Sequence, residues 1–100
     1  PYVLSRYMEV TGDTGILNEQ VGFIQGPPLE HGHMEMMFIP GHTDERSSLY
    51  DHCIRALKRA LMRGPHGLPL MGGGDWNDGM NLIGKDGLGE SCWLGWFIIE

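Results

Sequence analysis

The chain has 100 residues, of which 41% are hydrophobic and 20% charged, and its formal net charge is −6. This length suits one small domain with a modest core. The 7 Lys and Arg residues form no run or stripe. Nucleic acids and anionic membrane surfaces require clustered positive charge, so neither is expected as a partner. A neutral ligand fits this balance better than a polyanion, and the longest apolar run is far too short to cross a bilayer.

The first two segments predict a helix followed by an extended excursion. Residues 1–10 carry apolar side chains at helical spacing, and Gly12 suits the left-handed cap that would end the helix. Residues 16–40 have only weak strand content. The candidates for a short strand there are Val21, Phe23 and Ile24. His31 and His33 flank a glycine, but without a third ligand in view a solvated loop is favoured over a metal pair, and no metal site is expected.

The next segment carries the clearest helical signal. Thr43 is a natural N-cap, and the acidic residues that follow it suit the positive end of the helix dipole. Apolar residues then recur at steps of three and four and form one stripe. They are Leu49, Tyr50, Cys53, Ile54, Leu57, Ala60 and Leu61. Because Gly64 and Pro65 end the pattern, the sequence predicts a helix of roughly five turns from Thr43, docked on a larger body.

Glycine is the outlier of the composition, with 16 residues. Many of them fall in residues 64–89, which predicts a loop with unusual backbone angles. A second helix is expected from about Glu90, and its apolar residues leave almost no polar face, as in a helix buried on several sides. Helix, long loop and helix predict a mainly α fold. Because the chain begins at Pro1 and ends just after an apolar run, residues 1–100 are interpreted as an internal fragment of a larger domain.

The segment 72–81, Gly-Gly-Gly-Asp-Trp-Asn-Asp-Gly-Met-Asn, places two carboxylates, an amide and an indole between glycines. Trp76 offers a flat face on which a sugar ring stacks, while Asp75, Asn77 and Asp78 can bind hydroxyl groups. A carboxyl pressed against an indole is partly desolvated, which raises its pKa and lets it act as an acid near neutrality. A calcium loop is excluded because the sixth position is not glycine, and a P-loop because Gly-Lys-Ser/Thr is absent. A structural turn remains an alternative.

The surrounding residues carry a family resemblance. Residues 66–97 contain His-Gly-Leu-Pro-Leu-Met-Gly-Gly-Gly-Asp-Trp-Asn-Asp-Gly-Met-Asn and, further on, Gly-Glu-Ser-Cys-Trp-Leu-Gly-Trp-Phe. This segment closely resembles glycoside hydrolase family 94, the inverting disaccharide and oligosaccharide phosphorylases. Thr-Gly-Asp at 11–13, Gly-Pro-Pro-Leu at 26–29 and Asp-Glu-Arg at 44–46 look most like the phosphorylase domain of cyclic β-1,2-glucan synthases. The resemblance covers nearly the whole chain, and Asp-Trp-Asn-Asp is quite specific to the family.

This resemblance implies a catalytic domain built as an (α/α)6 barrel, to which the chain would contribute about three helices. Asp78 matches the general acid of the family. Trp76 would line the sugar subsite at the cleaved bond, and Asp75 and Asn77 would bind hydroxyl groups or orient Asp78. Inorganic phosphate is the co-substrate and takes the place of the water and base of an inverting hydrolase, so one catalytic carboxylate suffices and no cofactor is implied.

The implied partners are a β-linked gluco-oligosaccharide and phosphate, and the implied product is α-glucose 1-phosphate. No phosphate ligand can be assigned within the chain. His66 could reach the site, but a packing role is favoured, and Glu90 is expected to open the second helix rather than to touch substrate. The implied location is cytoplasmic, or at the cytoplasmic face of the inner membrane, with any membrane contact made by other parts of a parent protein. A homodimer is left open.

Two alternatives remain at the level of function. One is a true inverting glycoside hydrolase, which would need a second carboxylate roughly 6.5–9.5 Å from Asp78. Asp75 is too near in sequence to fill that role comfortably. The other is a non-catalytic module that binds glucan or assists assembly, in which the same indole and amides only hold sugar.

Overall fold

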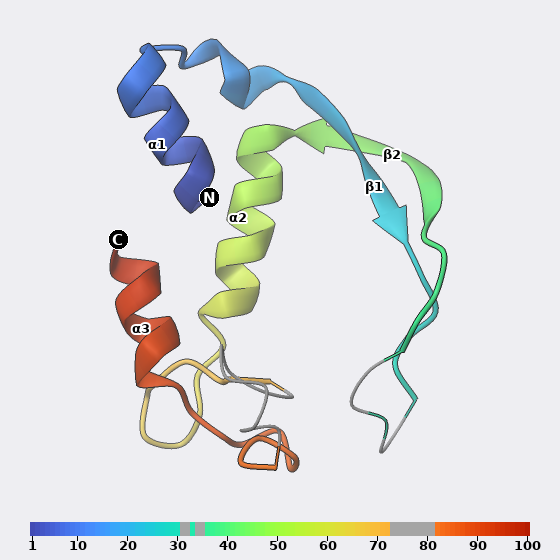
Figure 1. Cartoon of the computed structure of the whole chain (residues 1–100), viewed down its shortest axis with the longest axis vertical. Helices are drawn as coiled ribbons and strands as arrows, with labels where there is room; N and C mark the ends of the chain where they lie inside the picture. Colours follow the sequence, from blue (N-terminus) through green and yellow to red (C-terminus); the bar gives the residue numbers. More distant parts are fainter. Residues whose placement is uncertain (31–32, 34–35, 73–81) are drawn as a thin grey trace. The chain divides into compact units, whose positions relative to one another are not determined.

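A computed structural model describes residues 1–30, 33, 36–72 and 82–100. Two compact units divide the chain, Pro1–Arg55 and Ala56–Glu100. Figure 1 traces the elements in chain order. They are helix α1 (Tyr2–Thr11), the short 3₁₀ helix η1 (Gly15–Asn18), strands β1 (Gln20–Gln25) and β2 (Gly41–Ser48), and helices α2 (Leu49–Ala60) and α3 (Cys92–Ile99).

Helix α1 ends where the sequence predicts. Gly12 adopts a left-handed backbone with φ 71°, and its N–H donates to the carbonyl of Met8 at 2.8 Å. The hydroxyl of Tyr7 donates to the Asp13 carboxylate at 3.1 Å, which fixes the turn after the helix. The predicted glycine cap is therefore confirmed.

Strands β1 and β2 form a two-stranded antiparallel sheet. Gln20 pairs with Ser48 at one end and Gln25 with Gly41 at the other. The register shifts between Gly22 and Ile24, where β2 contributes more residues than β1. Such a bulge strengthens the local twist of the ribbon. The predicted short strand, with Val21, Phe23 and Ile24, therefore lies within β1. Its partner strand, β2, carries no apolar residue.

The start of α2 lies later than predicted. Thr43 does not cap a helix: it lies within β2, where its hydroxyl donates to the carbonyl of Phe23 at 3.2 Å. The cap is Ser48, whose hydroxyl oxygen accepts from the N–H of Asp51 at 3.1 Å. Helix α2 consequently has 12 residues, against the roughly five turns that the apolar stripe predicted.

The prediction of a mainly α chain, with the chain as part of an (α/α)6 barrel, is wrong for the chain as described. Its described residues contain three α-helices and a two-stranded antiparallel sheet, a mixed α and β arrangement. The error arises at β2, whose sequence Gly-His-Thr-Asp-Glu-Arg-Ser-Ser offers no alternation of apolar and polar residues. Hydrogen bonding to β1 decides its conformation, and periodicity cannot detect such pairing.

The second unit begins in the last residues of α2 and continues through two isolated β-bridges to α3. Arg63 bridges Pro69, and Leu70 bridges Glu90, both in antiparallel fashion. Helix α3 starts at Cys92, and the hydroxyl oxygen of Ser91 accepts from the N–H of Leu94 at 2.9 Å. The helix expected from about Glu90 is therefore confirmed within two residues.

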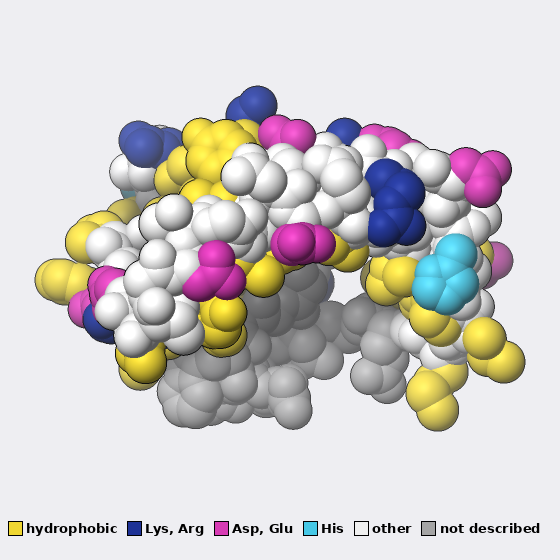
Figure 2. Space-filling model, turned by 90° about the horizontal axis from the view of Figure 1, so that it is seen from above, with side chains coloured by type: hydrophobic (Ala, Val, Ile, Leu, Met, Phe, Trp, Pro, Cys, Tyr) yellow, Lys and Arg dark blue, Asp and Glu magenta, His cyan; other side chains and the backbone are white. Residues whose placement is uncertain are grey.

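Apolar side chains are extensively exposed in the described part of the chain. Among the described residues no apolar side chain is buried. The one polar residue that is buried there is Ser91, with 2% of its surface exposed. Figure 2 shows hydrophobic side chains open to solvent on the face that it presents. Among the described residues, no helix combines the length and the apolar character needed to cross a membrane.

Candidate active site

All four residues predicted to act on a sugar lie outside the described residues. Asp75, Trp76, Asn77 and Asp78 belong to the segment 73–81. Their roles remain predictions from the sequence. The structure describes the residues before this segment, up to residue 72, and those after it, from residue 82.

Backbone hydrogen bonds join the residues just before this segment to residues 89–91. The N–H of Met71 donates to the carbonyl of Gly89 at 2.9 Å, and the N–H of Ser91 donates to the carbonyl of Pro69 at 2.8 Å. These bonds place residues 69–71 alongside residues 89–91, with Leu70 bridged to Glu90 between them. We refer to residues 69–72, 84 and 89–91 as the neck.

Glycines let the neck close tightly. A Cβ added at Gly84 would lie 3.1 Å from Cγ of Met71 and in collision with the carbonyl oxygen of Gly72. A Cβ added at Gly89 would lie 2.9 Å from Cα of Gly84. Since real Cβ atoms do not approach other atoms this closely, these positions admit no side chain without a shift of the backbone. Gly72 itself has φ 69°, a region that favours glycine.

Glu90 connects the neck to the turn at residues 64–68. Its carboxylate accepts from the backbone N–H of His66 at 3.1 Å and from that of Leu68 at 3.0 Å. It also accepts from Nδ1 of the His66 ring at 2.7 Å. The Glu90 side chain is 9% exposed, whereas that of His66 is 81% exposed. Gly64 leaves room for this approach, because a Cβ there would lie 2.5 Å from Cγ of Glu90.

These contacts set the charge of Glu90. Burial raises the pKa of the carboxyl, but the hydrogen bonds from the His66 ring and from the N–H groups of Leu68 and His66 together outweigh it and lower the pKa below its ordinary value. The carboxylate therefore stays ionised at neutral pH. A proton donor for catalysis needs the opposite shift, so Glu90 does not have the character of a general acid.

The sequence interpretation missed the pairing of His66 with Glu90. Glu90 immediately precedes the cap of α3, which agrees with its interpretation as the residue that opens this helix. Its carboxylate, however, accepts hydrogen bonds from a turn that lies 22 to 24 residues earlier in the chain. The one signal available in the sequence was that both residues belong to segments that resemble family 94. The resemblance gave no reason to pair them.

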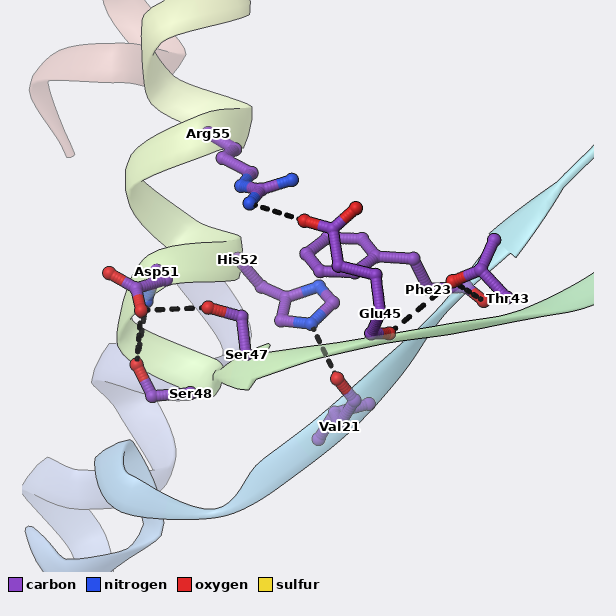
Figure 3. A network of polar contacts seen from close by, with 9 residues as sticks. All are labelled: Val21, Phe23, Thr43, Glu45, Ser47, Ser48, Asp51, His52 and Arg55. Carbon is purple, nitrogen blue, oxygen red and sulfur yellow. Dashed lines mark hydrogen bonds and ion pairs between the residues drawn. The ribbon is translucent and has the colours of Figure 1, made fainter.

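A second polar cluster lies in the first unit, between the sheet and α2. Figure 3 shows Glu45 pointing toward Arg55, with Phe23 and His52 beside them. The rings of Phe23 and His52 stack with centroids 4.0 Å apart, and the Arg55 guanidinium lies 4.4 Å from the Phe23 centroid. Nε2 of His52 donates to the carbonyl of Val21 at 3.1 Å, which fixes the tautomer because a carbonyl only accepts.

This cluster joins elements rather than offering groups to a ligand. Arg55 is committed to Glu45 at 2.7 Å, and His52 is committed to Phe23 and to the backbone of β1. His52 is therefore a structural residue of this cluster. Within the part of the chain that the structure describes, no group of three or more His, Cys, Asp and Glu side chains could hold a metal ion.

Comparison with known proteins gives the family. The model of the glycosyl hydrolase 94 superfamily catalytic domain matches residues 3–100. The chain is 50% identical over 98 residues to a cyclic β-(1,2)-glucan synthase of Rhizobium meliloti. The aligned residues cover 97% of the chain and 4% of that protein. Two proteins of Paenibacillus borealis, a 3-O-β-D-glucopyranosyl-β-D-glucuronide phosphorylase and a solabiose phosphorylase, are 40% and 33% identical over 91 residues. These 91 residues cover 90% of the chain and 10% of each phosphorylase.

The matching family model is that of a carbohydrate-active catalytic domain. The chain belongs to the glycosyl hydrolase 94 superfamily, as the resemblance of its sequence predicted. It spans between 4% and 10% of the length of these relatives.

Proposed function

We propose that the chain acts within a full-length family 94 protein that cleaves β-glucosidic bonds with inorganic phosphate and inversion. The observation that carries the proposal is that the chain belongs to the family and contains Asp-Trp-Asn-Asp at residues 75–78. The phosphorylase names of two of its relatives support phosphorolysis. The identity of 50% to a cyclic β-(1,2)-glucan synthase supports a protein of that kind as the parent.

In the proposed mechanism Asp78 is the general acid and gives its proton to the glycosidic oxygen as the C1–O bond breaks. A phosphate oxygen attacks C1 from the opposite face, so a β-glucoside yields α-glucose 1-phosphate and a free sugar hydroxyl. Trp76 would stack on the sugar ring at the cleaved bond, while Asp75 and Asn77 would bind its hydroxyl groups. Since phosphate is already a nucleophile, no second carboxylate is needed as a base.

Proton NMR of the first product tests the proposal. A full-length family 94 protein that contains this sequence is incubated with β-linked gluco-oligosaccharides, with and without phosphate. We expect an anomeric signal of α-glucose 1-phosphate that appears only when phosphate is present.

Three outcomes would count against the proposal. A β-configured sugar phosphate would contradict inversion. Cleavage at the same rate without phosphate would identify a hydrolase. Binding of glucan without turnover would favour a non-catalytic module, and calorimetric titration with the same oligosaccharides detects it.

A further inference from the structure

We propose that His66 is a sugar-binding residue: Glu90 holds its ring through Nδ1, and Nε2 accepts a hydrogen bond from a hydroxyl group of a saccharide. The inference deepens the proposed function and rests on it for the class of ligand, a β-linked gluco-oligosaccharide. It assigns a binding role to a histidine for which the sequence favoured packing.

The first argument is that the backbone around His66 is fixed. A turn begins at Gly64, whose carbonyl accepts from the N–H of Gly67 at 3.0 Å. The N–H of Gly64 donates to the carbonyl of Leu68, also at 3.0 Å. The Glu90 carboxylate then accepts the N–H groups of His66 and Leu68, at 3.1 and 3.0 Å. The His66 side chain therefore projects from a turn that is held on both sides of it.

The second argument is the direction of the hydrogen bond from the ring. Nδ1 of His66 lies 2.7 Å from Oε2 of Glu90, a short distance that is typical of a bond to a charged acceptor. Burial raises the pKa of this carboxyl, but the hydrogen bonds that it accepts outweigh burial and lower the pKa, so the ionised group only accepts. The ring proton is therefore on Nδ1. In the neutral ring Nε2 keeps a lone pair, which accepts from an O–H group.

The third argument is that Nε2 is open to a ligand. The side chain of His66 is 81% exposed, whereas that of Glu90 is 9% exposed. Within the described part of the chain Nε2 makes no hydrogen bond. Space is open beside it as well, because a Cβ added at Gly67 would meet no atom within 4 Å. Since the ring and its backbone are already held, little conformational freedom is lost when a ligand binds.

The chemistry of the pair selects a hydroxyl group over other ligands. A metal ion needs several ligands, and the described residues offer no group of three or more His, Cys, Asp and Glu. An oxyanion would meet the lone pair of Nε2 and the ionised Glu90 behind the ring, and both repel negative charge. A sugar is neutral and rich in O–H donors, and the chain belongs to a family of carbohydrate-active catalytic domains.

Carbethoxylation by diethyl pyrocarbonate tests the inference in the full-length protein, because this reagent acylates an imidazole nitrogen that carries a lone pair. Mass spectrometry follows the rate at His66 without ligand, with a β-linked gluco-oligosaccharide and with inorganic phosphate. A saccharide at ten times its Kd should slow the reaction about tenfold, by mass action at Nε2, and phosphate should leave it unchanged. His42, an exposed histidine of β2, is the internal control and should react at one rate throughout.

Two substitutions of His66 provide a matched pair. In His66→Gln the side-chain amide reaches about as far as Nε2, whereas in His66→Asn it reaches only as far as Nδ1. Both variants keep the backbone N–H that Glu90 accepts, so the turn stays held. By calorimetric titration we expect Kd for the oligosaccharide to rise about 3- to 10-fold in His66→Asn, the loss of one hydrogen bond, and less than about twofold in His66→Gln.

The outcomes separate this inference from the proposed function. A saccharide that binds by calorimetry but leaves the rate at His66 unchanged refutes the role of His66 alone. Protection by phosphate instead of saccharide does the same, as does a ring that fails to react without any ligand. Equal affinities of His66→Asn and His66→Gln also overturn it. If no saccharide binds to the wild-type protein, the proposed function is contradicted and this inference falls with it.

Discussion

Glu90 and Ser91, which are neighbours in the sequence, both hold backbone groups through their side chains. The carboxylate of Glu90 accepts N–H groups that the turn at residues 64–68 leaves without partners, and the hydroxyl of Ser91 accepts one at the start of α3. Each satisfies a donor that would otherwise be unpaired at a crowded place. At the residue scale the neck is thus held by acceptors placed opposite specific backbone donors.

At this scale we predict that Asp78→Asn in the full-length protein removes nearly all phosphorolysis of a β-glucoside. An amide cannot supply the proton, and general acid catalysis contributes ~10²–10⁴-fold. Initial rates of α-glucose 1-phosphate formation measure the loss. Asp75→Asn is the matched comparison and should lose less, because its proposed role is to bind or orient. A variant Asp78→Asn that kept more than a tenth of the wild-type rate would show that another group is the acid.

Individual positions differ in how far the sequence could predict them. Gly12 was predictable because a left-handed cap follows from local chemistry, glycine after a run of helical periodicity. The acceptor role of Glu90 was not, because its partners lie more than 20 residues away and two of them are backbone groups, which every residue carries. Asp75, Trp76, Asn77 and Asp78 were assigned by resemblance and lie outside the described residues, so their arrangement stays a prediction.

At the scale of elements, the pairing of β2 with β1, rather than local helix propensity, sets the boundary between β2 and α2. Thr43 and the acidic residues after it have the local features of a helix start, yet they lie in a strand that pairs with β1. Ser48 then begins the helix, and the hydroxyls of Ser47 and Ser48 both donate to the Asp51 carboxylate, at 2.8 and 3.0 Å. These two hydroxyls lower the pKa of Asp51, Ser47 more than Ser48. The apolar stripe located the helix, but only long-range hydrogen bonds could place its first residue.

We therefore predict that Ser48→Ala weakens the first turn of α2, whereas Thr43→Ala does not. Loss of an N-cap hydroxyl costs about 1 kcal/mol, or about fivefold in the opening equilibrium of the turn. Hydrogen exchange of the full-length protein, followed by mass spectrometry, reports on the amides of residues 49–53. Exchange should accelerate about fivefold in Ser48→Ala by this cost, and should be unchanged in Thr43→Ala. The reverse order would restore the predicted cap at Thr43.

At the scale of the whole molecule, the burial pattern bears on stability. Two-stranded ribbons and short helices are marginal in water unless an apolar face is packed. In the described part of the chain no apolar side chain is buried, and α3 leaves large ones open to solvent. Their exposed fractions are 63% for Trp93, 72% for Trp96, 58% for Phe97 and 79% for Ile99. The neck and the capped helices supply hydrogen bonds, but each contributes only about 0.5–1.5 kcal/mol net.

It follows that these 100 residues, expressed alone, should not unfold as a cooperative monomer. Each large apolar side chain left in water forgoes roughly 1.5–3 kcal/mol of burial. A domain has only about 5–15 kcal/mol of total stability, so the open side chains of α3 are enough to cancel that margin. We expect a broad calorimetric trace with no single heat-absorption peak, and self-association in sedimentation, because exposed apolar surface seeks a partner. The full-length protein, measured in the same buffer, is the control and should give at least one sharp transition. A sharp transition from a monomer of the 100 residues would show that this chain carries a sufficient core of its own.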